Sequence, residues 1–216
     1  MKKLIIFDLD GTLLDTSDGI MYCYKTTGKL LGLEKKTVEN EKFVIGGPLK
    51  DGFSRLYNIH SEKELENAVD TYRTTYSKEG LTKFTVYEGI EETLKTLKEN
   101  GYLLAVATLK LENYARQMLK QAGLADYFNL IHGWDGTDKC TKAFIITKIL
   151  YTLNALPDST VLVGDSDYDE KGAEASEVDF LGVSYGFGIT KDDAKLKKYP
   201  VVNSTDEIAD YIINEI

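Results

Sequence analysis

Residues 4–16 read LIIFDLDGTLLDT, four apolar residues in a row and then three aspartates within eight positions. The apolar run has the composition of a buried strand, and Gly11 suits a turn directly after it. Asp8, Asp10 and Asp15 would then be crowded together just beyond the strand. Carboxylates a few ångströms apart repel one another, and the pKa of one member of a close pair normally rises. Such crowding indicates either a polar turn or a site where a cation or a reaction makes use of the negative charge.

Strand-like and helical segments alternate along most of the remaining chain. The predicted strands after the first are 102–108, 128–132, 160–165 and 180–184, and the predicted helices are 90–97, 111–122, 141–153, 169–177 and 205–215. Near-continuous apolar strands separated by amphipathic helices are typical of parallel sheets that are covered on both faces. The sequence therefore predicts an α/β fold with a doubly wound, mostly parallel, Rossmann-like sheet.

Residues 17–84 interrupt this alternation. They contain long helical patterns, such as the apolar series from Leu65 to Tyr76, and almost no strand signal. A stretch of this length is too long for a crossover loop between two strands. We expect it to be a separate, inserted helical module, with residues 1–16 and 85–216 forming the catalytic core. An insertion at this point would sit over the carboxyl ends of the strands, where parallel sheets bind ligands.

The charge balance limits the classes of partner. The chain has 26 basic and 35 acidic residues, a net charge of −9, which argues against a surface that binds duplex nucleic acid. A small anionic substrate stays compatible with this charge, because a local site can be positive on an acidic protein.

Membrane and disulfide signals are weak. The first apolar run is too short for a signal peptide, and no other run approaches the length of a membrane span. Cys23 and Cys140 are too few for a disulfide framework and lack metal-ligand spacing. These features favour a reducing, cytoplasmic compartment, and they leave the oligomeric state open.

Polar residues follow several of the predicted strands at their carboxyl ends. Because these ends converge on one edge of a parallel sheet, we expect their side chains to share a site. A few carboxylates, several waters and a phosphate suit Mg²⁺, while a hydroxyl and a lysine can bind the other phosphate oxygens. The candidate residues are Asp8, Asp10, Thr108, Lys142, Asp165 and Asp169.

Four motifs in order resemble the haloacid dehalogenase superfamily of phosphohydrolases. DLDGTLLD resembles the first motif, D-x-D-G-T, and Thr108 in VAT is similar to the second. Lys142 in CTKAFII falls where the third motif supplies a lysine, and VGDSDYDEKGA at 163–173 resembles the fourth. The inserted module resembles the helical cap of this superfamily. Its segment IGGPLKDGF at 45–53 is similar to the cap of phosphoglycolate phosphatases and related 5′-nucleotidases.

The resemblance implies a mechanism for this site. Asp8 would attack phosphorus and form an aspartyl-phosphate, and Asp10 would act as general acid and then as general base. Thr108 and Lys142 would bind the phosphate. Mg²⁺ would be bound by Asp8, Asp165 and the backbone carbonyl of Asp10, with Asp169 acting directly or through water. An aspartate at position 10 favours a phosphatase or a phosphomutase within the superfamily.

Some alternatives stay open. The third-motif region lacks the Lys-Pro pair common in relatives, so Lys139 and Lys148 compete with Lys142 for this role. A sugar phosphomutase is the main rival to a phosphatase. A phosphorelay receiver also combines aspartates, a threonine and a lysine, but it is shorter and has no insertion. The substrate is expected to be a small phosphorylated metabolite, such as phosphoglycolate, a nucleotide or a sugar phosphate.

Overall fold

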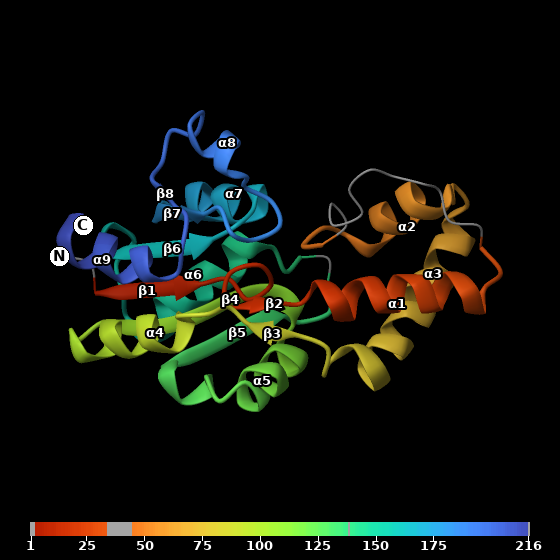
Figure 1. The fold of residues 1–216 in the computed structure, drawn as a ribbon, viewed down its shortest axis with the longest axis horizontal. Coiled ribbons are helices and arrows are strands. Elements are labelled where there is room, and N and C mark those ends of the chain that lie inside the picture. The colour runs from red at the N-terminus through yellow and green to blue at the C-terminus, as the bar shows by residue number, and fades with distance from the viewer. Residues whose placement is uncertain (1–2, 34–44, 138, 216) are drawn as a thin grey trace. The chain divides into compact units, whose positions relative to one another are not determined.

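The computed structural model describes residues 3–33, 45–137 and 139–215 (Figure 1). The chain divides into two compact units, Met1–Asp15 with Val86–Ile216, and Thr16–Thr85. The predicted insertion, 17–84, differs from the second unit by one residue at each end. Its residues 34–44 lie outside the described part of the chain.

Within the described residues, the first unit contains a six-stranded sheet in the order β5-β4-β1-β6-β7-β8. Every neighbouring pair is parallel. Its strands are β1 (Leu4–Phe7), β4 (Leu103–Leu111), β5 (Leu130–Trp134), β6 (Thr160–Gly164), β7 (Asp179–Val183) and β8 (Val201–Val202). Two further strands, β2 (Leu14–Asp15) and β3 (Thr85–Val86), form a separate two-stranded sheet.

Helices connect these strands. The helices of the first unit are α4 (Ile90–Glu99), α5 (Glu112–Gln121), α6 (Lys142–Leu153), α7 (Asp167–Ala175), α8 (Lys191–Ala194) and α9 (Asp206–Glu215), with short 3₁₀ turns at Ala125–Tyr127 and Pro157–Ser159. Helix α6 packs against α7, α4 packs against α9, and α5 packs against β4 and β5. The predicted α/β class with a mostly parallel sheet is confirmed. Among the described helices, none has the length and apolar character needed to cross a bilayer.

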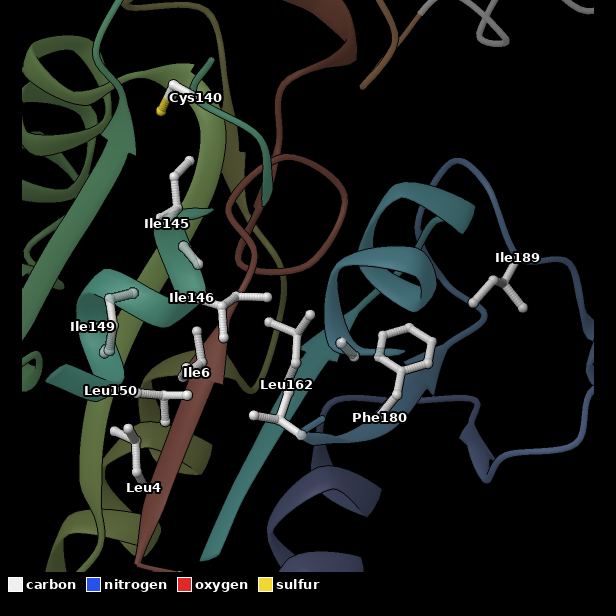
Figure 2. Packing of buried hydrophobic residues seen from close by; sticks show 14 residues of the cluster. Leu4, Ile6, Cys140, Ile145, Ile146, Ile149, Leu150, Leu162, Phe180 and Ile189 are labelled. Atoms are coloured by element: carbon white, nitrogen blue, oxygen red, sulfur yellow. The ribbon is translucent and has the colours of Figure 1, made fainter. Parts of the chain in front are cut away.

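The apolar character of β1 follows from burial on both of its faces. Successive side chains of a strand point to opposite faces, so Leu4 and Ile6 share one face while Ile5 and Phe7 share the other. All four are fully buried. Figure 2 shows the first of these faces, where side chains of α6 pack against β1 and β6. The labelled residues of this cluster are Leu4, Ile6, Cys140, Ile145, Ile146, Ile149, Leu150, Leu162, Phe180 and Ile189.

Most element boundaries differ from the sequence prediction by one or two residues, and two of these differences lie near the candidate site. The strand predicted at 102–108 continues to Leu111, with a shift of its register against β5 between Ala107 and Leu111. The helix predicted at 169–177 begins two residues earlier, at Asp167, because Ser166 caps it. The extended part of β4 follows Thr108, and the earlier start of α7 places Asp169 in its first turn.

Between Thr16 and Phe84, the regular structure of the described residues is helical. It consists of α1 (Ser17–Leu30), α2 (Leu49–Tyr57), α3 (Glu62–Thr75) and a π-helical turn, η2 (Tyr76–Gly80). The core of this unit is aromatic: the ring of Tyr24 lies 4.7 Å from that of Phe53 and 4.9 Å from that of Tyr72, centroid to centroid. The apolar face of α3 that the sequence predicted, from Leu65 to Tyr72, is buried.

Candidate active site

The first two aspartates stand in a tight turn directly after β1. The backbone N–H of Asp8 donates to the carbonyl of Val163 in β6, at 2.9 Å, so hydrogen bonding to the sheet holds the backbone of Asp8 in place. Gly11 has a φ of 88°, a left-handed conformation that favours glycine. A Cβ at Gly11 would lie 2.3 Å from an oxygen of Asp165. The glycine therefore lets the turn approach the end of β6 closely.

Lys142 joins two of the carboxylates. Its Nζ lies 2.6 Å from Oδ1 of Asp8 and 2.7 Å from Oδ1 of Asp169, and it donates to the carbonyl of Ala107 at 2.9 Å. Lys142 opens α6 and is buried. Gly172 of α7 leaves room for its stem, since a Cβ there would lie 2.5 Å from Cγ of Lys142. The ammonium group is thus enclosed by the ends of β1, β4 and α7.

Asp165 follows β6 and is held by a loop that comes later in the chain. Its Oδ2 accepts hydrogen bonds from the backbone N–H groups of Phe187, at 2.6 Å, and Gly188, at 3.3 Å. Its own carbonyl accepts from Ile189 at 2.7 Å. Gly186 packs closely enough that a Cβ would lie 2.4 Å from Cβ of Asp165. The G-F-G segment at 186–188 therefore supports this carboxylate.

Asp169 takes part in a capping box at the start of α7. Its Oδ2 accepts from the hydroxyl of Ser166, at 2.6 Å, and from the backbone N–H of the same residue, at 3.1 Å. Its other oxygen faces Lys142. The capping box therefore fixes the orientation of Asp169 toward the lysine.

Three carboxylates come close enough to share a metal ion. Asp8, Asp165 and Asp169 are buried, and each offers an oxygen within 4.8 Å of the others. Oxygen ligands of this kind suit a hard divalent cation such as Mg²⁺. Asp10, the fourth carboxylate nearby, pairs with Lys110, whose Nζ lies 3.1 Å from its Oδ1. If all four carboxylates are ionised, Lys142 and Lys110 leave two negative charges, which a divalent cation would balance. The residues present thus fit a divalent metal ion.

The pKa values reflect the same crowding. Burial raises the pKa of Asp8 to about 7, with Asp169 and Asp10 adding to the rise and Lys142 opposing it. Burial raises the pKa of Asp165 well above its ordinary value, helped by Asp169 and Asp8. For Lys142, burial lowers the pKa, but the pull of Asp169 and Asp8 is stronger, so the net pKa is raised and the lysine keeps its charge. A cation among the carboxylates would stabilise their ionised forms.

Thr108 and Asp10 are both linked to Lys110. Thr108 is buried on β4, one residue beyond the carbonyl that Lys142 binds, and its Oγ1 accepts the backbone N–H of Lys110 at 3.1 Å. The side chain of Asp10 does not join the three-carboxylate group. Its Oδ1 instead lies 3.1 Å from Nζ of Lys110.

Sequence reasoning missed two parts of this arrangement, Lys110 and the backbone amides of Phe187 and Gly188. Lys110 lies two residues after Thr108, and the alternation along a strand would have placed both on one side. Of the rival lysines, Lys139 and Lys148 are both exposed, whereas Lys142 reaches the carboxylates.

The family of the chain is shown by comparison with known proteins. The sequence profile of the haloacid dehalogenase-like hydrolase family matches residues 5–183. That range contains every strand of the sheet except β8, and every carboxylate of the site. The chain belongs to the haloacid dehalogenase-like hydrolase family, and the family predicted from the four motifs is confirmed.

Several curated relatives share about a third of their residues with the chain. A 5′-nucleotidase of Pseudomonas aeruginosa is 33% identical over 186 residues, which cover 85% of this chain and 83% of that protein. A phosphoglycolate phosphatase of Aquifex aeolicus is 31% identical over 206 residues, which cover 94% of this chain and 94% of that protein. The tyrosine-protein kinase PtkA of Mycobacterium tuberculosis is 32% identical over 188 residues, and the chain spans 63% of that protein's length.

A solved structure agrees with this assignment. The crystal structure of a predicted phosphatase from Clostridium acetobutylicum superimposes with a TM-score of 0.88 at 34% identity, covering 99% of each chain. The likeness therefore extends over both compact units and not only over the sheet.

Proposed function

We propose that the protein is a Mg²⁺-dependent phosphatase that hydrolyses a small phosphomonoester through an aspartyl-phosphate on Asp8. The observation that carries this proposal is the buried cluster in which Lys142 pairs with both Asp8 and Asp169 while Asp165 faces them. Curated relatives named phosphoglycolate phosphatase, 5′-nucleotidase and pyrophosphatase support the reaction class.

Asp8, Asp165 and the backbone carbonyl of Asp10 would hold the metal ion. Asp169 would act directly or through a bound water: its Oδ2 accepts hydrogen bonds from Ser166, whereas its Oδ1 faces Lys142 in an ion pair. When bound, Mg²⁺ supplies positive charge that keeps Asp8 ionised and shields it from the charge of the phosphate.

The chain's own residues carry out two displacements. An oxygen of Asp8 forms a bond to phosphorus while the bond from phosphorus to the leaving oxygen breaks, and Asp10 gives its proton to that oxygen. A water molecule then attacks phosphorus, Asp10 takes a proton from it, and the bond to Asp8 breaks to release inorganic phosphate. Thr108 and Lys142 bind phosphoryl oxygens, whose charge they stabilise in both transition states.

The second compact unit, Thr16–Thr85, is proposed to act as a cap that selects the substrate. The helical structure of its described residues and its insertion directly after the first motif support this role. The proposed substrates are phosphoglycolate, a nucleoside monophosphate or a sugar phosphate, and pyrophosphate is screened with them as a phosphoanhydride. A screen of these compounds for phosphate release would identify the preferred one.

The proposal is tested by phosphate release with and without the metal. EDTA should abolish turnover, and Mg²⁺ should restore it. Asp8→Asn should abolish turnover, because an amide cannot act as the nucleophile, whereas Asp126→Asn, at an exposed aspartate, should leave it unchanged. Full activity in EDTA, or in Asp8→Asn, would contradict the proposal.

Two other reactions would be recognised by their products. A sugar phosphomutase would exchange isomers without net release of phosphate. Transfer to a tyrosine hydroxyl is a second candidate, favoured by the 32% identity to a protein named tyrosine-protein kinase. It would appear as labelling of a protein from γ-labelled ATP, with the label on tyrosine and not on Asp8.

A further inference from the structure

We infer that Lys110 is a positioning residue for Asp10, holding the carboxylate of the proposed general acid and base in place. This inference rests on the proposed phosphatase function. Nζ of Lys110 lies 3.1 Å from Oδ1 of Asp10, and both side chains are largely buried, with 9% and 12% of their surfaces exposed. A lysine is rarely buried to this extent unless its charge is paired.

The backbone around Lys110 is shaped to place its side chain there. The register of β4 against β5 shifts between Ala107 and Leu111, and Lys110 lies inside this irregular stretch. Gly133 of β5 makes room for it, because a Cβ there would lie 2.6 Å from the carbonyl of Lys110. Irregularities of this kind often re-aim a side chain beside an active site.

Lys110 also connects the two halves of the proposed chemistry. Its backbone N–H donates to Oγ1 of Thr108, the proposed phosphate-binding hydroxyl, while its side chain binds Asp10. One residue thus sets the distance between the group that binds phosphate and the group that moves the proton.

The two lysines of the site divide the carboxylates between them. Lys142 faces Asp8 and Asp169, whereas Lys110 faces Asp10, whose carboxylate stands apart from the three that lie within 4.8 Å of one another. Removing the Lys110 ammonium would delete this ion pair in a strongly negative site, so the Asp10 carboxylate could shift from its position. A misplacement of about 1 Å can cost about 100-fold in rate.

The experiment measures the pre-steady-state release of 4-nitrophenolate from 4-nitrophenyl phosphate, whose leaving group needs little protonation. In Asp10→Asn the first displacement should proceed and the second should be slow, giving a burst of one nitrophenolate per enzyme. Lys110→Met should give the same burst, with a slow phase about 10- to 100-fold below wild type. KM should fall together with kcat, because slowing only the second displacement lowers both and leaves kcat/KM unchanged. Lys110→Arg should recover part of the rate, and Lys120→Met, at an exposed lysine of α5, should match wild type.

A double-mutant cycle separates positioning from direct contact with the substrate. If Lys110 acts through Asp10, the double variant should be no slower than Asp10→Asn alone. Losses that multiply, or a raised KM with an unchanged slow phase, would overturn the inference. Thermal melting of each variant, together with the smaller polar change Lys110→Gln, identifies losses caused by unfolding. If wild type releases no phosphate, the proposed function fails; if it does and Lys110→Met behaves as wild type, only the role of Lys110 fails.

Discussion

Replacing Asp8 by asparagine should stabilise the metal-free protein while abolishing its activity. Burial, helped by Asp169 and Asp10 and opposed by Lys142, raises the pKa of Asp8 from its ordinary value of 3.8 to about 7. The native protein therefore holds this proton more tightly than the unfolded chain does. Stability from this group falls as pH rises from about 4 to about 7, and it stays at the lower level above pH 7. At about 1.36 kcal/mol per pH unit, the loss is about 4 kcal/mol.

Asparagine keeps the shape of Asp8 and can still accept the hydrogen bond from Lys142, but it carries no charge. In EDTA at about pH 8, Asp8→Asn should gain as much as about 4 kcal/mol, which for a chain of this length is roughly 10 °C in Tm. The gain should shrink toward about pH 4, where Asp8 is protonated in the native wild-type protein. Mg²⁺ should raise the Tm of wild type more than that of the variant, because it binds the native site.

The assay is thermal unfolding of wild type, Asp8→Asn and the exposed-site control Asp126→Asn across this pH range. The control should follow wild type at every pH, because its side chain is exposed. A Tm of Asp8→Asn equal to or below that of wild type at about pH 8 in EDTA would refute the reasoning. It would mean that Lys142 already compensates the buried charge in full.

Three further substitutions test the support of the site. Lys142→Ala should lower turnover by about 10- to 1000-fold, whereas Lys139→Ala should not, because Lys139 is exposed. A larger loss at Lys139 would show that Lys139, and not Lys142, is the lysine of the third motif. Thr108→Ala should lower turnover within the same range of about 10- to 1000-fold, since its hydroxyl is proposed to bind phosphate. Its Tm should fall modestly, because the backbone N–H of Lys110 loses its acceptor. Gly186→Ala would place a Cβ 2.4 Å from Cβ of Asp165. Because this clash should displace a proposed metal ligand, more Mg²⁺ should be needed for half-maximal activity. An unchanged Mg²⁺ requirement would show that the loop moves to accommodate the added methyl group.

The sheet and part of its site could be predicted from the sequence. Strands buried on both faces are apolar along most of their length, as the four residues of β1 and Val161, Leu162 and Val163 of β6 show. Parallel strands end on the same edge, so polar residues just beyond them must approach one another. For this reason Asp8 and Asp165 could be named as neighbours although 157 positions separate them in the numbering.

Other features of the site depend on contacts between distant residues, which the order of residue types along the chain does not reveal. The supports of Asp165 are backbone N–H groups of Phe187 and Gly188, which every residue except proline possesses, so side-chain identity gives no signal for them. The pairing of Lys110 with Asp10 depends on a shift of register within β4.

The sequence by itself determined which residues are buried along each strand and where the carboxylates begin. Only the tertiary structure decided which charge faces which, because ion pairs form between side chains whose separation depends on how the strands pack. Lys142 reaches Asp8 across 134 positions of sequence, and this contact exists only because α6 begins beside the end of β1. Backbone hydrogen bonding and close packing at the glycines then hold those charges at fixed distances.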